Sequence, residues 1–255
     1  MSWFGLLASF ACLMYIVYYL FRVVQRPWFI CKSGRFREHL SAYCGRFLEE
    51  CFWPPFWCIT PNVQCLVGLL FQRWQRRLPF RRQLLRLSDG AVVALDWLNE
   101  GTSDGPVLLF LTGLTSDSQV YYLRTLLPRV AAMGHPCVVF NNRGQGDLPL
   151  LNHKLVCGLS IDDLAEVIAA IKERSPDGPL FAVGYSLGGV LLSHYLRLKG
   201  DDARIDAAVA ISTPFHLATS RKNLMSWSAS YFLNIYLAYW LVRCLRKNRD
   251  VLLAS

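Results

Sequence analysis

Residues 184–188 read Gly-Tyr-Ser-Leu-Gly and join two segments of different pattern. The apolar run from Leu180 to Val183 predicts a buried strand before them, and a helix is predicted after them to about Lys199. A sharp strand-to-helix turn strains the backbone at its serine, and glycines on either side keep Cβ atoms clear of it. We therefore predict that Ser186 presents its hydroxyl at a helix N-terminus, as a nucleophile for acyl transfer. The alternative is a packing turn without chemistry.

An acyl-transfer serine also needs N–H donors for the oxyanion that forms on the substrate. The backbone N–H of Leu187, directly after the serine, is the first predicted donor. The second is expected from the loop at residues 111–115, Leu-Thr-Gly-Leu-Thr, where the N–H of Leu114 is the candidate. The alternative for this loop is a simple connection between a strand and a helix.

The elements that position these groups follow an alternating α/β pattern after the turn signal Asp89-Gly90. Unbroken apolar runs, such as residues 107–111, are typical of strands buried on both faces, so a mostly parallel sheet with flanking helices is expected. Strands are predicted at 91–97, 106–111, 137–140, 180–183 and 204–214. Helices are predicted from Ser118 to about Ala132, from an N-cap signature at Ser160 and Asp163 to Pro176, and from Ser186 to Lys199.

Longer stretches of sequence are also distinctive, above all Asn-Asn-Arg-Gly at 141–144 after a buried strand. The others are Arg-Pro-Trp at 26–28, Leu-Ser-Asp-Gly at 87–90, Ala-Leu-Asp-Trp at 94–97, Thr-Gly-Leu-Thr at 112–115, Val-Val-Phe at 138–140, Asp-Leu-Ala-Glu-Val-Ile at 163–168 and Ala-Val-Gly-Tyr-Ser-Leu-Gly-Gly at 182–189. Together they cover most of residues 26–215. In these stretches the chain resembles the membrane-anchored α/β-hydrolase-domain family of serine esterases and phospholipases, which carries a single N-terminal anchor.

The resemblance implies an α/β-hydrolase fold. It also implies hydrolysis of carboxylic ester bonds in lipids, phospholipids or acylglycerols by a Ser-His-Asp triad, without a metal or a cofactor. The implied location is the endoplasmic reticulum or a similar internal membrane. The chain departs from the family at Thr112, where the family tends to have Pro, and this puts the detailed shape of the oxyanion loop in doubt.

The triad cannot be completed from the sequence. In this fold an acid and then a histidine follow the serine, but only 69 residues follow Ser186. Two further βαβ units of roughly thirty residues each do not fit there, so a C-terminally truncated hydrolase is expected. No acid or base is therefore assigned.

The histidines present are poor substitutes for the base. His194 is expected to point along the helix that follows Ser186. His216, just after the last strand, is the better of these two candidates for the base. His135 and His153 fall in connecting loops. The acidic residues Asp201, Asp202 and Asp206 are expected at the wrong end of the sheet.

The N-terminus carries a candidate membrane anchor. Residues from Trp3 to Phe21 contain no charge and would extend about 28 Å as a helix, close to the thickness of the hydrocarbon core. The alternative is a buried core helix. Arg22 and Arg26 follow the span, and by the positive-inside rule the body of the protein is expected in the cytosol, behind an uncleaved single-pass anchor.

The net charge of +9 belongs to residues 1–88, which hold twelve Arg and Lys against three Glu. Basic residues beside an apolar span favour anionic lipid headgroups, and no nucleic-acid partner is expected. Residues 72–87 are predicted to be either an amphipathic segment lying on the membrane or a solvated basic face. The nine cysteines lack metal-ligand spacing, and an odd number excludes complete pairing, so no metal site is expected.

Four parts are expected: a transmembrane anchor at 1–25, a basic and aromatic membrane-proximal segment at 26–88, the α/β-hydrolase core at 89–215 and a helical, lid-like cap at 216–255. Residues 224–245 are expected to be a lid helix, with a second membrane contact as the alternative. Two functions stay open. One is a membrane-bound lipid serine esterase or phospholipase, and the other is an anchored, non-catalytic hydrolase-like binding or scaffold protein.

Overall fold

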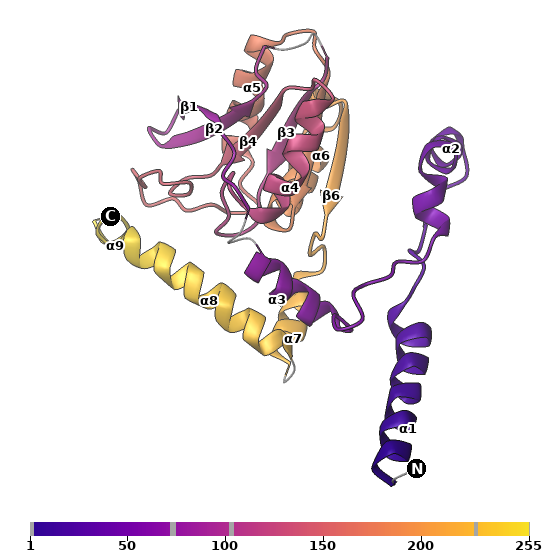
Figure 1. The fold of residues 1–255 in the computed structure, drawn as a ribbon. Helices are drawn as coiled ribbons and strands as arrows, with labels where there is room; N and C mark the ends of the chain where they lie inside the picture. Colours follow the sequence, from indigo (N-terminus) through magenta and orange to yellow (C-terminus); the bar gives the residue numbers. More distant parts are fainter. Residues whose placement is uncertain (1–2, 72–74, 102–104, 227–228, 255) are drawn as a thin grey trace. The chain divides into compact units, whose positions relative to one another are not determined.

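A computed structural model describes residues 3–71, 75–101, 105–226 and 229–254 of the chain (Figure 1). Two compact units are present, Met1–Gly68 and Leu69–Ser255. The first unit holds α1 (Trp3–Tyr18), the π-helical turn η1 (Tyr19–Val23), α2 (Arg35–Glu49) and most of α3 (Pro61–Phe71). Pro61 begins α3, as expected for a residue without an N–H at the first helical position.

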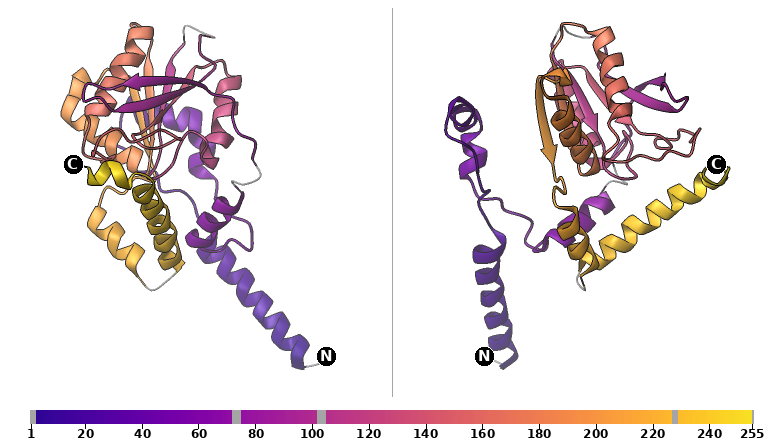
Figure 2. Two further views of the ribbon diagram at one scale, coloured as in Figure 1. Left: turned by 90° about the vertical axis from the view of Figure 1, so that its left-hand side faces the viewer. Right: turned by 180° about the vertical axis from the view of Figure 1, so that it is seen from behind.

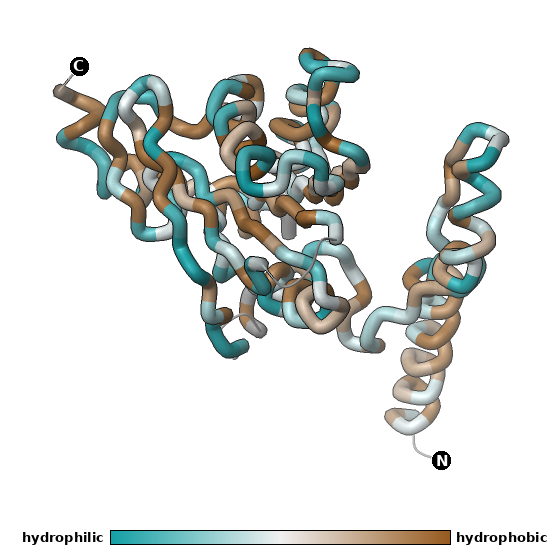
Figure 3. Tube along the Cα trace, turned by 90° about the horizontal axis from the view of Figure 1, so that it is seen from above, coloured by the Kyte–Doolittle hydropathy of each residue, from teal (hydrophilic) through white to brown (hydrophobic). Residues whose placement is uncertain are grey.

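The predicted N-terminal helix is present and extends slightly further than expected. Among the described residues, Trp3–Val23 is the one stretch long and apolar enough to cross a membrane, with a mean hydropathy of 2.0. None of it is buried against the rest of the chain, which argues against a core helix. In the tube of Figure 3 this helix is mainly pale to brown, and brown marks the hydrophobic end of the scale.

The second unit is built on a six-stranded sheet with the strand order β1-β2-β4-β3-β5-β6. The strands are β1 (Arg81–Arg86), β2 (Val92–Leu98), β3 (Val107–Leu111), β4 (Cys137–Asn141), β5 (Leu180–Tyr185) and β6 (Ala207–Ile211). β4, β3, β5 and β6 are parallel, whereas β1 and β2 run antiparallel to their neighbours. The expected α/β architecture with a mostly parallel sheet is therefore confirmed.

Helices cover both faces of this sheet (Figure 2). Buried side chains alternate along each strand, so that Leu109 faces one layer while Phe110 faces the other. α4 (Tyr121–Ala132) packs Leu123 and Leu127 against the Phe110 side. α5 (Asp162–Arg174) and α6 (Leu187–Lys199) cover the opposite side through apolar residues at helical spacing, Leu164, Val167, Ile168, Ile171, Leu191 and Leu192.

The remaining elements follow the fifth strand and its helix. The 3₁₀ turn η3 (Gly200–Ala203) leads into β6, and α7 (Leu217–Met225), α8 (Ala229–Lys247) and α9 (Arg249–Leu253) follow it. The expected helical segment after residue 216 is thus present. Trp227 and Ser228, which belong to that prediction, lie outside the described residues.

β1 was not predicted. The segment 72–87 was expected to lie on the membrane or to be a solvated basic face, but Arg81–Arg86 pairs with Trp97 to Val92 of β2. An edge strand tolerates arginines because much of it faces water. In Arg81–Arg86 the only apolar residues, Leu84 and Leu85, are adjacent and do not alternate with polar ones, so the pattern did not predict a strand. Arg73 and Trp74 of the same segment lie outside the described residues.

The predicted cap of α5 is also wrong. The helix begins at Asp162 with Ile161 as its N-cap residue, and no side chain caps it. The carboxylate of Asp163 is bound instead by the guanidinium of Arg143. A long-range ion pair therefore replaces the local capping bond that Ser160 and Asp163 predicted.

Candidate active site

Ser186 lies at the junction of β5 and α6 in a strained backbone conformation. Its φ is 51° and its ψ is −114°, a region that non-glycine residues rarely adopt and that costs about 1–3 kcal/mol. Its N–H donates to the carbonyl of Ile211 at 2.9 Å, and its own carbonyl accepts from the N–H of Val190 at 3.1 Å. The side chain is exposed. The turn therefore presents the hydroxyl outward and is held from both β6 and α6.

The two glycines of the motif are required by the packing of this turn. A Cβ atom on Gly184 would lie 2.6 Å from the carbonyl oxygen of Gly188. A Cβ atom on Gly188 would lie 2.5 Å from the carbonyl oxygen of Leu111, at the end of β3. Both distances are shorter than any real contact, so the start of α6 can approach the β3 loop only because both residues lack side chains.

The predicted oxyanion loop passes beside Ser186. A Cβ atom on Gly113 would stand 3.4 Å from Cβ of Ser186. Thr112 closes the loop by donating from Oγ1 to the carbonyl of Ser116 at 3.0 Å. Proline is typical at this position in the family that the sequence resembles. Thr112 instead adds a hydrogen bond within the loop.

Two backbone N–H groups near the serine differ in their availability. The N–H of Gly113 donates to the hydroxyl of Tyr122 at 3.3 Å. For the N–H of Leu114 no hydrogen bond is found among the described residues. Leu187 is the first residue of α6, and the first N–H of a helix has no acceptor within it. The geometry is compatible with the predicted pair of donors, whose role stays a prediction.

Tyr122 lies under the loop as its support. Its ring packs against that of Tyr185 with 4.4 Å between the centroids. Burial raises the pKa of Tyr122 to about 12, against the opposing effect of the bond from Gly113. The phenol is therefore neutral at physiological pH and its oxygen accepts the Gly113 N–H. Tyr122 was not among the residues predicted for the site, because nothing in its local sequence pattern places it near Ser186.

No candidate base reaches the serine among the described residues, since no hydrogen bond joins Ser186 to a histidine there. His216 is the N-cap of α7, and its Nδ1 accepts from the N–H of Thr219 at 3.3 Å. His194 lies half-buried on α6. His135 precedes β4, at the end of the strand opposite to the serine, and its buried Nδ1 has no partner in the described part of the chain.

The remaining titratable candidates lie elsewhere in the unit. His153 is exposed in the long connection before α5. Asp201 and Asp202 are in η3, and Asp206 accepts from the N–H of Leu180 at 2.8 Å, at the start of β5. The structure thus places Asp206 at the amino end of the strand that carries Ser186 at its other end, as the sequence indicated.

A buried carboxylate organises the other side of the oxyanion loop. Asp96 on β2 is 1% exposed and accepts two bonds of 2.7 Å from Arg82 of β1. It also accepts from Ser118 Oγ at 2.5 Å and from Asn141 Nδ2 at 2.9 Å. Burial raises the pKa of Asp96, but these bonds and the charge of Arg82 outweigh burial and hold it below the usual value. With its lone pairs engaged, this carboxylate ties β1, β2 and β4 to the segment after the loop.

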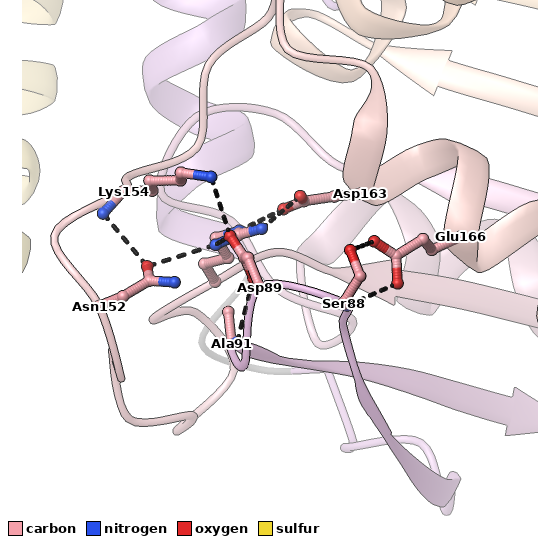
Figure 4. Close-up of polar contacts among 8 residues, drawn as sticks. Ser88, Asp89, Ala91, Asn152, Lys154, Asp163 and Glu166 are labelled. Atoms are coloured by element: carbon pink, nitrogen blue, oxygen red, sulfur yellow. Dashed lines mark hydrogen bonds and ion pairs between the residues drawn. The ribbon is translucent and has the colours of Figure 1, made fainter.

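A second ionic cluster explains part of the distinctive sequence at 141–144. Arg143, 6% exposed, binds both carboxylate oxygens of Asp163 and donates to Asp89 at 2.8 Å (Figure 4). The bond from Arg143 holds the pKa of Asp89 well below its usual range. Lys154 also binds Asp89, at 3.2 Å. The cluster fastens the connection after β4 to the turn before β2 and to α5, so its role is structural.

The cysteines and acidic residues form no metal site that the structure describes. Among the described residues, no group of three His, Cys, Asp or Glu side chains could hold an ion. All nine cysteines are free thiols, and burial raises the pKa of Cys137, at the start of β4, to about 12.

Comparison with known proteins decides the family. The alpha/beta hydrolase fold family matches residues 106–239, which is more than half of the chain and includes β3, the oxyanion loop and Ser186. The chain belongs to the alpha/beta hydrolase fold family. The strand order and the parallel sheet with helices on both faces are those of a member of this family.

Curated relatives include phospholipases. Phospholipase ABHD3 of Mus musculus is 28% identical over 257 residues, covering 97% of this chain and 60% of that protein. Protein abhd-3.2 of Caenorhabditis elegans is 30% identical over 209 residues, covering 81% of this chain and 56% of that protein. The chain thus spans about three fifths of the length of these relatives. Among solved structures, the esterase Pf2001 of Pyrococcus furiosus has a TM-score of 0.49 and 19% identity, with 66% and 67% of the two chains covered.

Proposed function

We propose that this chain carries the nucleophile of a membrane-bound serine hydrolase of the lipid esterase or phospholipase type. The observation that carries the proposal is the conformation of Ser186, an exposed serine held at φ 51° between a parallel strand and a helix N-terminus. Strain of this kind persists only where the surroundings enforce it, and it is typical of functional sites. The similarity to phospholipases supports a lipid ester as the substrate.

The proposed reaction starts from the exposed hydroxyl of Ser186. Ser186 Oγ attacks the acyl carbon of the ester, its proton passes to a base, and the alcohol leaves with a proton to give an acyl-enzyme. Water then attacks the same carbon and releases the fatty acid and the free serine. The N–H groups of Leu114 and Leu187 are the proposed donors to the oxyanion of both tetrahedral intermediates. No residue is assigned as the base or the acid, and no cofactor or metal takes part.

An activity-based probe tests the nucleophile. A fluorophosphonate should label the full chain in detergent, and Ser186→Ala should abolish the labelling. Ser212→Ala is the matched control, because Ser212 is also exposed and also has a φ of 51°. Labelling that is absent from the native chain, or that survives in Ser186→Ala, would overturn the proposal.

The second candidate function is an anchored hydrolase-like binding protein that keeps the turn without catalysis. It is favoured by one observation, that no histidine of the described residues bonds to Ser186. Removing triad members from a serine hydrolase costs orders of magnitude in rate. Lipid binding without probe labelling or ester hydrolysis would support this candidate over the first.

For location, we propose that residues 1–25 form a single-pass anchor in the endoplasmic reticulum or another internal membrane. The support is the apolar helix Trp3–Val23, followed by Arg26, Lys32, Arg35 and Arg37. By the positive-inside rule, the proposed orientation has the second unit in the cytosol. Protease added to intact microsomes should then digest the second unit. Digestion only after detergent has been added would show that the second unit lies on the lumenal side of the membrane.

A further inference from the structure

α8 has two apolar faces, and only one of them is turned toward the protein. The inner stripe, Leu233, Leu237, Trp240 and Cys244, is half-buried and ends at Asn248, which is 5% exposed. Asn248 lies against the β4 loop, since a Cβ atom on Gly144 would be 3.5 Å from its Nδ2. α8, yellow in Figure 1, thus has one half-buried side and one side that is exposed to solvent.

The outward side carries large apolar groups in open solvent. Phe232 is 70% exposed, Ile235 50%, Tyr239 58% and Val242 42%. These residues follow one another at helical spacing, and Arg243 and Arg246 continue the face toward the end of the helix. We call these six residues the outer face of α8. A contiguous apolar surface of this kind usually marks a site of interaction with a protein or a membrane.

The positive charge of the surrounding segment limits the kinds of partner that the outer face could bind. Between Ala207 and Arg249 the sequence contains no Asp or Glu and six Arg or Lys. On α7, Arg221 and Lys222 stand beside the exposed side chains of Leu217 and Met225. A second copy of the chain would bring the same cations against each other in a two-fold interface.

We propose that the outer face of α8 docks on an anionic lipid bilayer, with the apolar side chains in the headgroup boundary and the cations against the phosphates. The proposal is independent of the catalytic role of Ser186. α7 starts shortly after Ile211, whose carbonyl holds the N–H of Ser186. Docking would therefore set the carboxyl end of the sheet, where Ser186 lies, toward the lipid.

Photocrosslinking in the full chain tests the contact without depending on activity. p-Benzoylphenylalanine replaces Tyr239 of the outer face, or, as the matched control, Tyr236, which is half-buried and packs against Trp240 of the inner stripe. Each protein is reconstituted in vesicles of phosphatidylcholine, with or without phosphatidylserine, and irradiated. Mass spectrometry should find lipid adducts at position 239 in the anionic vesicles, and mainly protein adducts at position 236.

A charge variant tests the role of the cations. Replacing Arg243, Arg246 and Lys247 by Gln should weaken docking of the face roughly a hundredfold, because each of the three surface cations contributes about fivefold. Adducts at 239 should then fall to the level of neutral vesicles, while the apolar N-terminal helix is unchanged. Protein adducts at 239, equal lipid adducts at 236 and 239, or adducts that ignore phosphatidylserine would each overturn the proposal.

Discussion

At the scale of single residues, the site depends on two glycines that have no side chain as much as on Ser186 itself. Gly184 and Gly188 leave room for Ser186 to take a conformation that opposes its own Cβ. The local motif made this turn predictable from sequence. Other contacts join residues far apart in the chain, so no local pattern predicts them. Tyr122 accepts a hydrogen bond from Gly113, and Asp96 accepts hydrogen bonds from Arg82 and Asn141.

Relief of the strain at Ser186 should be measurable. Ser186→Gly should raise the free energy of unfolding by about 1 kcal/mol, because glycine accepts a positive φ without the cost that serine bears there. Probe labelling should disappear in the same variant. Ser186→Ala is the control, since it also loses the hydroxyl but keeps the Cβ atom and the strain. Equal stability of the two variants in urea denaturation would contradict this explanation.

The buried carboxylate of Asp96 predicts a dependence of stability on acid. Its pKa is lower in the folded chain than in the unfolded chain, so its contribution is complete above about pH 4 and is lost as the pH falls through the folded value. Asp96→Asn should cost about 2 kcal/mol at pH 7 and flatten this part of the curve.

Urea unfolding of the chain in detergent between pH 2 and pH 7, roughly the range that carboxylates titrate over, measures the effect. The exposed Asp177→Asn is the control and should change stability by less than about 0.5 kcal/mol. An Asp96→Asn variant that keeps the full acid dependence would show that other groups cause it.

At the scale of elements, apolar runs made β2 to β6 predictable. Such a run is expected where a strand is buried on both faces, as β3 and β4 are along most of their length, whereas β6 is apolar but exposed. β1 escaped prediction because its arginines satisfy an edge position, and the start of α5 was misplaced because Arg143 captures Asp163. Both misses come from tertiary contacts that override a local pattern.

The opposite edge of the sheet, β6, carries a risk of self-association. Ala207 to Ala210 are exposed, and Val209 is 54% exposed, so one side of this strand offers unpaired backbone groups. Val209→Lys should reduce aggregation without lowering stability, since a charged edge opposes strand addition. Leu84→Lys on β1 is the matched control and should have a smaller effect. Sedimentation velocity in detergent compares them, and equal sedimentation of both variants with the native chain would contradict the expectation.

At the scale of the whole molecule, the chain combines an apolar N-terminal helix with a hydrolase sheet whose last helices are basic and apolar. The net charge lies in residues 1–88, and the basic residues of the last helices are balanced by acidic residues elsewhere in 89–255. Sequence alone gave the helix and the charge. It left open whether residues 224–245 touch the membrane, because that depends on which side of α8 the fold leaves bare.

Deletion of the anchor should change how the chain is held on membranes. The full chain should resist alkaline carbonate and require detergent for release, because its helix Trp3–Val23 is long and apolar enough to span. A variant without residues 1–25 should remain bound only at low salt and be released at high salt, as expected for contact through cations. Fractionation followed by immunoblotting checks this. Release of the full chain by carbonate would refute the anchor.

The bond from the Ser186 N–H to the carbonyl of Ile211 also fixes an order of events during synthesis. The serine leaves the ribosome before Ile211 does, so this bond cannot form until both residues have been synthesised. It waits until β6 has been translated and has paired with β5. By then the N-terminal helix has long been available for targeting to a membrane. The turn would therefore gain this bond late in synthesis, after the apolar helix Trp3–Val23 has left the ribosome.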